Sequence, residues 1–407
     1  LISDGMAFAT VAADPFHASV CAPRRQASCA WRVSRTRKIA RYVNKGAWPP
    51  EAGWFGSMLD ELFILGLYLA LAMLFVWAFR NLPDERWQIM GCIPAKRNDD
   101  GAWRGVNLTW YGFFNALAIS SAVAVFCTLS TAAGQSIFAA LGIAALAMAI
   151  CLPAASIVAR LVEGKRSTLS VGGASFVGML ILPWVIFLVS VVTESLSFQP
   201  VAVLPLLAAV SIAYAFGEGI GRLACVSFGC CYGKKISDCP SWIQSLFAKS
   251  CFVFSGKTKK IAYAHQLDGQ RVFPVQALTA VILCLTGLVG FYLFLKGFLA
   301  AAFLLTLTVS QLWRLISEVL RADYRGRGRI SAYQVMAGAA VVYGWGVAWL
   351  FGEATALPVH LAEGLVALWR PGVILFFGIL FAVSFLYTGK SSVTDCVIRI
   401  DVVKEKI

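Results

Sequence analysis

Long apolar stretches recur along this chain with the length of membrane-spanning helices. Each has about 20 residues, which a helix needs to cross a hydrocarbon core of about 30 Å. Polar segments rich in Arg, Lys and Gly separate them. The pattern predicts an all-α, polytopic helical membrane protein with about nine transmembrane helices, at residues 61–79, 110–129, 136–158, 171–192, 201–216, 275–294, 298–317, 332–351 and 371–388.

The composition agrees with a membrane protein and argues against a nucleic-acid partner. Hydrophobic residues make up 59% of the 407 residues and charged residues 14%, whereas soluble domains have about 45–50% and about 25%. The net charge of +14 comes from basic residues between the apolar stretches. Basic residues at such places orient a membrane protein or meet anionic lipid headgroups.

The basic segment 1–55 sets the expected orientation. No apolar run follows within its first 30 or so residues, so we do not expect a cleavable signal peptide. We interpret this segment as a cytoplasmic arm, because Lys and Arg are enriched on the cytoplasmic side. Counting crossings then assigns four loops to the outer side, namely 80–109, 159–170, 217–274 and 318–331.

Two groups of ionisable residues lie in apolar surroundings, where each costs roughly 2.5–3.5 kcal/mol and is a candidate for function. In the first group, Glu218 and Arg222 are four residues apart and would share one helix face. The glycines among these residues allow another helix or a lipid headgroup to approach closely. A frayed helix end with an interfacial Arg is the simpler alternative.

In the second group, Arg314, Glu318 and Arg321 recur at helical spacing. A guanidinium group binds phosphate through a planar fork of donors, and a carboxylate can orient that fork or move a proton. The alternative is a helix terminus whose long side chains reach the interface. The two groups together predict an Arg-lined site for an anionic lipid headgroup.

Five cysteines crowd the loop 217–274, and their role stays open between three alternatives. If the loop faces an oxidising compartment, disulfides such as Cys230 or Cys231 with Cys239 would rigidify it. A reactive thiol is the second alternative. A metal site is the third, but it would want clearer paired spacing, and we expect no metal. The five are Cys225, Cys230, Cys231, Cys239 and Cys251.

Five short motifs, in order along the chain, resemble those of bacterial prolipoprotein diacylglyceryl transferases. They lie at 108–113, 169–174, 216–233, 273–276 and 313–321, the last with its sequel at 330–334. Members of that family have seven spans, which would correspond to spans two to eight here. The resemblance implies a basic arm at 1–55, an added span and loop at 56–104, a transferase-like core at 105–351 and an added span and tail at 352–407.

The resemblance also implies a reaction of lipoprotein biosynthesis, without a cofactor, in the bacterial cytoplasmic (inner) membrane. A lipobox cysteine of a substrate protein attacks the glyceryl carbon of phosphatidylglycerol and displaces glycerol phosphate. Matching motif positions imply catalytic roles for Arg222, Arg314 and Glu318, with Glu318 orienting Arg314. They imply phospholipid binding by Tyr111, Gly172, Gly173, Gly221, Gln276 and Arg321.

Several polar positions of the family motifs are changed in this chain. Val171 and Phe273 stand in place of histidines, Cys225 and Phe228 in place of asparagines, and Cys230 in place of a glutamate. Two hypotheses therefore remain. One is an enzyme acting on phosphatidylglycerol or another anionic phospholipid, and the other is a non-catalytic lipid-binding relative that serves as a subunit of a larger membrane complex. An open headgroup pocket near Arg222 favours the enzyme, and a cleft plugged by the added spans favours the subunit.

Overall fold

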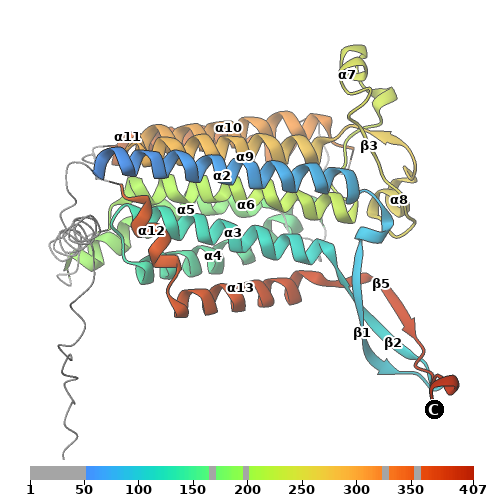
Figure 1. Ribbon diagram of the computed structural model, residues 1–407. Helices are drawn as coiled ribbons and strands as arrows, with labels where there is room; N and C mark the ends of the chain where they lie inside the picture. The colour runs from blue at the N-terminus through green and yellow to red at the C-terminus, as the bar shows by residue number, and fades with distance from the viewer. Residues whose placement is uncertain (1–51, 165–170, 196–200, 323–329, 353–358) are drawn as a thin grey trace, which may run out of the picture. The chain divides into compact units, whose positions relative to one another are not determined.

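The computed structural model describes residues 52–164, 171–195, 201–322, 330–352 and 359–407. Within these ranges, nine helices are long and apolar enough to cross a membrane, which confirms the predicted polytopic helical fold. Figure 1 shows them side by side. They are α2 (Ala52–Asn81), α3 (Trp110–Ala132), α4 (Ile137–Glu163), α5 (Val171–Ser195), α6 (Val203–Phe228), α9 (Val275–Leu295), α10 (Leu299–Leu320), α11 (Ala332–Phe351) and α13 (Pro371–Gly389), with the short α12 (Leu361–Leu368) before α13. Residues 1–51 of the predicted arm lie outside the described residues.

Helix α6 continues well past the predicted end at residue 216, because its glycines permit close helix packing. A side chain at Gly219 would meet the Cys284 sulfur of α9, and one at Gly217 would meet Ala122 of α3. Close packing offsets the roughly 1 kcal/mol that each glycine costs in a helix. In its most apolar window, α6 is 72% buried, more than any other of the described spans. The Glu218–Arg222 segment is therefore inside the bundle and not at a frayed end.

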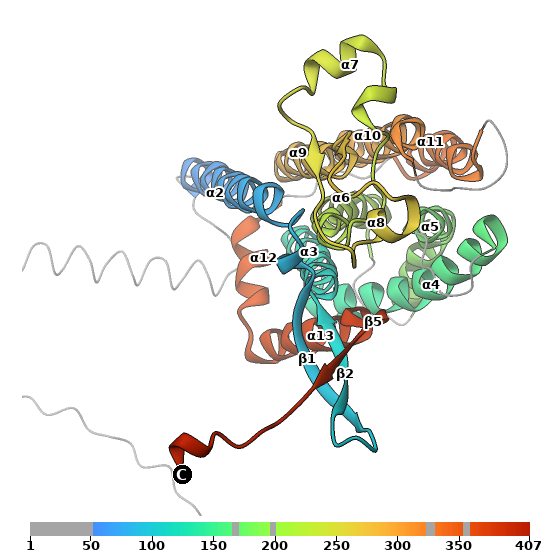
Figure 2. The same cartoon turned by 90° about the vertical axis from the view of Figure 1, so that its right-hand side faces the viewer.

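A three-stranded antiparallel sheet, which the hydrophobic pattern did not predict, extends from one end of the bundle (Figure 2). Its strands are β1 (Ile89–Arg97), β2 (Trp103–Thr109) and β5 (Lys390–Ile398), in the order β1-β2-β5. A disulfide joins Cys92 of β1 to Cys396 of β5. A side chain at Gly105 of the central strand would collide with both sulfur atoms. A glycine there is what lets the bridge cross the middle strand.

The two spans outside the core pack on its periphery. Helix α13 approaches the start of α3 through Gly389 against Gly112, and Phe381 stacks edge-on against Phe113. Helix α2 lies beside α9, where Phe63 and Phe291 have ring centroids 5.6 Å apart. Both spans therefore add to the outside of the bundle.

The long loop after α6 is ordered against the same end of the bundle as the sheet (Figure 1). It contains α7 (Ser241–Leu246), α8 (Lys260–His265) and the strand pair β3 (Phe252–Val253) and β4 (Arg271–Val272). The fully buried Lys259 fastens it, because Nζ donates to the carbonyl oxygens of Ser227 at 2.7 Å and Leu82 at 3.1 Å. These carbonyls lie at the ends of α6 and α2, where a cation is favoured by the helix dipole.

Candidate functional site

An ion cluster of Tyr214, Glu218, Arg222 and Arg314 joins α6 to α10 inside the bundle. Arg222 donates from Nη2 to Oε1 of Glu218. Nη2 of Arg314 donates to Oε2 of Glu218 at 2.6 Å and to the Tyr214 hydroxyl at 2.5 Å. That hydroxyl in turn donates to Oε2 of Glu218. Arg222 and Arg314 are 92 residues apart along the chain, yet they converge on one carboxylate.

Local sequence explains how the ion cluster forms. Tyr214, Glu218 and Arg222 recur every four residues, which places them on one face of α6. Arg314 reaches this face from α10 past the start of α5, where Gly172 leaves room for it. A Cβ atom at Gly172 would lie only 2.6 Å from Nη1 of Arg314. The glycine of the Gly-Gly motif therefore positions an arginine.

The ion cluster carries an excess of positive charge in a buried place. The side chains of Arg222, Arg314 and Glu218 are 15%, 11% and 6% exposed. Two guanidinium groups against one carboxylate leave one net positive charge. Among the described residues, the buried Nε atoms of Arg222 and Arg314 find no acceptor. An anion is the ligand that would satisfy both the charge and these donors.

Glu318 forms an ion pair with Arg321 at the end of its own helix. Its Oε1 lies 3.7 Å from Nη1 of Arg321, whereas Glu218 binds the guanidinium of Arg314. Glu218 is therefore the carboxylate that pairs with Arg314, and a role of Glu318 in orienting Arg314 stays a prediction. Arg314 extends towards α6, while Glu318 and Arg321 pair along α10.

A narrow polar pocket lies beside the ion cluster. It measures about 10 Å³, which is room for about one water molecule, so a phosphate would enter only as the side chains part. Gln276 is held in its wall by donating from Nε2 to the Cys230 carbonyl at 3.0 Å. Neither α2 nor α13 contributes to this wall. The lining residues are Arg222, Cys231, Val275, Gln276, Thr279, Ser317 and Arg321.

A much larger apolar cavity lies on the other side of the ion cluster. It has a volume of about 290 Å³ and is lined by side chains of α3, α4, α5, α6 and α10. Tyr214 belongs both to its wall and to the ion cluster. A charged pocket and an apolar cavity are thus separated by one layer of buried polar side chains. This order matches a phospholipid, whose charged headgroup adjoins its acyl chains.

Four of the residues expected to bind lipid, namely Tyr111, Gly172, Gly173 and Gly221, do not line the polar pocket. Tyr111 packs against Phe228, with ring centroids 5.5 Å apart. A side chain at Gly173 would meet Val158, and Gly221 faces Ala118 at an ordinary distance of 3.6 Å. These glycines serve helix packing. Gln276 and Arg321 do line the pocket.

Of the alternatives for the loop cysteines, a disulfide between Cys230 or Cys231 and Cys239 is not what the structure has, since these positions are thiols. Cys239 donates from Sγ to the carbonyl of Lys235, within its own turn, at 3.4 Å. The Cys251 sulfur instead accepts from Nε of Arg271 at 3.0 Å. The sulfur atoms of Cys225, Cys230 and Cys231, by contrast, lie within 4.8 Å of one another and could hold a metal ion.

Three polar residues of the site escaped the sequence prediction. Tyr214 could have been found, because it lies one helical turn before Glu218 on the same face. Thr279 and Ser317 line the polar pocket but carry no signal in the sequence, since hydroxyl groups are common in membrane helices. Thr279 accepts from Nε1 of Trp313 at 2.9 Å, which holds α9 and α10 together beside the pocket.

Comparison with known proteins adds one finding. Residues 102–350 match the sequence profile of a family described as prolipoprotein diacylglyceryl transferase. The matched region contains the ion cluster, the polar pocket and the apolar cavity. No curated protein shows significant similarity to the chain.

Proposed function

This chain belongs to the prolipoprotein diacylglyceryl transferase family, and from that premise we propose that it moves a diacylglyceryl group from phosphatidylglycerol to a thiol acceptor. Family membership makes it a multi-pass membrane protein of the transferase type involved in lipoprotein biosynthesis. The donor, the acceptor and the bacterial inner membrane are the proposed parts. A lipobox-bearing protein supplies the acceptor cysteine.

The observation that carries the proposal is the convergence of Arg222 and Arg314 on Glu218, between a charged pocket and an apolar cavity. A phosphodiester carries one negative charge, which the net positive charge of the ion cluster balances. Arg222 and Arg321 line the polar pocket and would bind the headgroup phosphate. The acyl chains would enter the apolar cavity, whose walls need no polar partner.

The proposed reaction is a displacement at carbon. The acceptor sulfur, as a thiolate, forms a bond to the glyceryl carbon while the bond from that carbon to the phosphate oxygen breaks. The electron pair leaves with glycerol phosphate, which gains a second negative charge. Guanidinium groups preorganised around this oxygen stabilise the transition state, and one such donor contributes about 10²–10³-fold in rate. Glu218 acts as a positioning residue for the two arginines.

The alternative, a non-catalytic lipid-binding subunit, has one specific observation in its favour. Within the described part of the chain, the residues that line the polar pocket include no carboxylate and no imidazole. The pocket wall therefore offers no carboxylate or imidazole as a general base to remove the proton of an acceptor thiol. On the other side, the added spans contribute no lining residue to the pocket or the cavity, so they do not plug the site.

The test is a transfer assay with full-length protein in lipid nanodiscs. Phosphatidylglycerol labelled in its headgroup glycerol is incubated with a lipobox peptide, and released glycerol phosphate is measured. We expect release by the native protein and a loss of about 10²–10³-fold in Arg222→Ala. Arg104→Ala, which removes an exposed arginine in the sheet, is the matched control and should release normally.

Two results would contradict the transferase. Lipid that binds in an Arg222-dependent manner without release of glycerol phosphate would identify a lipid-binding relative. Absence of both binding and release would refute the lipid site itself.

A further inference from the structure

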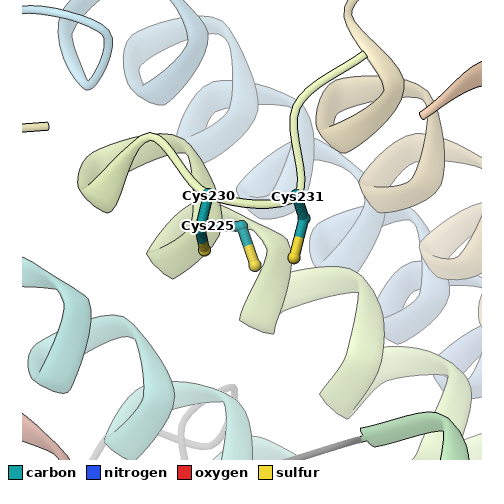
Figure 3. A group of neighbouring side chains, drawn as sticks. All are labelled: Cys225, Cys230 and Cys231. Atoms are coloured by element: carbon teal, nitrogen blue, oxygen red, sulfur yellow. The ribbon is translucent and has the colours of Figure 1, made fainter. Parts of the chain in front are cut away.

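Three thiols gather at the end of α6, beside the polar pocket. The sulfur atoms of Cys225, Cys230 and Cys231 all lie within 4.8 Å of one another, and Figure 3 shows the three side chains pointing the same way. We call them the thiol triad. Cys230 is buried, and the other two are half-buried. Cys231 also lines the polar pocket with Arg222, so one member of the thiol triad forms part of the pocket wall.

The end of α6 is built to bring these thiols together. Gly229 has a left-handed backbone, with φ of 68°, and its amide donates to the Val226 carbonyl at 3.2 Å. The amide of Cys230 donates to the Cys225 carbonyl at 3.0 Å. These two bonds form a Schellman motif, which folds Cys230 back over the last turn of the helix.

The next residue completes the arrangement. Cys231 has a φ of 55°, a conformation that residues other than glycine rarely adopt. Gln276 fixes the preceding peptide by donating to the Cys230 carbonyl. The backbone thus turns twice within three residues, and as a result the sulfur atoms of the two adjacent cysteines both lie within 4.8 Å of the Cys225 sulfur.

We propose that Cys225, Cys230 and Cys231 form a binding site for a thiolate-preferring metal ion such as Zn²⁺. In tetrahedral zinc sites with Zn–S distances of about 2.3 Å, the sulfur atoms are about 3.8 Å apart. The thiol triad is already close to that spacing. One disulfide uses two sulfur atoms and would leave the third thiol unexplained. A structural zinc site would need a fourth protein ligand. Three protein ligands with one open position are typical of catalytic zinc.

Charge and location agree with this assignment. A cation near thiols favours their thiolate form, which is the form that binds metal, and Arg222 lies three residues before Cys225 on α6. The sheet that contains the Cys92–Cys396 disulfide extends from the same end of the bundle as the loop after α6 (Figure 1). Conditions that oxidise this pair would also oxidise neighbouring thiols. A bound metal protects such thiols from oxidation.

The role of the site rests on the proposed function. Cys225 and Cys230 stand where the family motif has Asn and Glu, so this chain has two thiols in place of two polar side chains of the motif. Because Cys231 lines the polar pocket, a metal held by the thiol triad would be within reach of an acceptor sulfur in that pocket. A coordinated thiol loses its proton to solvent. The metal would thereby supply the thiolate that no side chain of the pocket wall can generate.

Zinc binding is measured on the full-length protein, purified in detergent with reductant and freed of metal. After addition of Zn²⁺ and removal of the excess, we expect about one zinc ion per chain. Cys225→Ser, Cys230→Ser and Cys231→Ser should each lower zinc affinity by at least about tenfold. Cys239→Ser and Cys251→Ser, in the same loop but outside the thiol triad, are matched controls and should keep it.

A second measurement needs no variant and therefore still tests the site if the substituted proteins fail to fold. In the native protein, zinc should protect Cys225, Cys230 and Cys231 from alkylation, and peptide mapping identifies the protected positions. Protection of other cysteines, binding that survives all three substitutions, or absence of binding would overturn the site.

The role has a separate test, which keeps its failure distinct from that of the transferase. Zinc binding is measured without lipid or peptide, so it does not depend on transfer. Removal of zinc should abolish release of glycerol phosphate, and readdition should restore it. Release that persists without zinc would overturn the role of the metal and leave the transferase proposal intact.

Discussion

Two arginine–carboxylate associations in this chain use the same groups in opposite surroundings. In the bundle, Arg222 and Arg314 share Glu218, and all three side chains are at most 15% exposed. In the sheet, Nη2 of Arg104 lies 3.0 Å from Oδ2 of Asp395, with side chains 66% and 61% exposed. An exposed pair contributes about 0–1 kcal/mol, whereas breaking a buried one costs about 3–5 kcal/mol.

The comparison shows that two features allow an association of charged groups to bind an anion. These features are its burial and its unequal numbers of cations and anions. The exposed pair is electrically neutral and its groups are already solvated, so it attracts no ligand strongly. The buried association has two cations for one anion and donors without partners. Its net positive charge therefore attracts an anion strongly, because little water is present to screen the interaction.

The largest effect is expected from Glu218→Gln, which removes the only carboxylate that the described contacts place between Arg222 and Arg314. The free energy of unfolding should fall by about 3–5 kcal/mol because two buried guanidinium groups lose their counter-charge. Transfer should fall by about 10²–10³-fold as both donors lose their position. Thermal unfolding in detergent and the transfer assay measure these effects. Glu363→Gln, at an exposed carboxylate of α12, is the control, and equal behaviour of the two variants would contradict the role of Glu218.

Gly172→Ala should give the next largest effect, by moving Arg314 without removing any charge. The added methyl group would lie 2.6 Å from Nη1, so the guanidinium must shift. A displacement of about 1 Å can lower a rate by about 10²-fold, with a smaller loss of stability. Gly338→Ala, which meets no atom within 4 Å, is the matched control. A normal rate in Gly172→Ala would show that the position of Arg314 is not critical.

Lys259 sharpens the comparison, because it is a buried cation held by carbonyl groups. Burial lowers its pKa from the ordinary 10.5 to about 8. Between these two pH values the unfolded chain binds more protons than the folded chain, so the free energy of unfolding should rise with pH across this window. The rise should be absent in Lys259→Met and present in Lys257→Met, an exposed lysine of the same loop. Denaturation at several pH values measures it, and a flat profile in the native protein would refute the shift.

The smallest effect is expected at the exposed pair. Asp395→Asn should change the free energy of unfolding by less than about 1 kcal/mol and leave transfer unchanged. Salt should weaken whatever contribution remains. A loss comparable to that of Glu218→Gln would mean that exposure does not distinguish the two associations.

Local sequence patterns predicted the features that depend on local physics. Apolar runs of about 20 residues identify spans because a bilayer requires internally hydrogen-bonded backbone over that length. The spacing of four between Glu218 and Arg222 predicted that they share one helix face, and the structure shows them there as an ion pair. The end of α6 was predicted too early, because the pattern treated its glycines as a break. Packing against α3 and α9 instead keeps that segment helical.

Features that join distant parts of the chain could not be predicted in this way. Cys92 and Cys396 are 304 residues apart, and no local signal connects them. The β1-β2-β5 sheet could not be predicted for the same reason, since its third strand comes from the far end of the chain. The sequence left the state of the loop cysteines open between disulfide, thiol and metal site, because proximity along the chain does not set the direction of a side chain.

The sequence by itself determined the number and approximate places of the spans, and which ionisable groups would be buried in them. Only the tertiary structure decided that Arg314 forms an ion pair with Glu218, and that the sulfur atoms of three of the loop cysteines lie close together. The physical reason is that the length of each apolar run decides by itself whether that segment spans the membrane. The partner of a buried charge or thiol depends on how helices from distant segments pack.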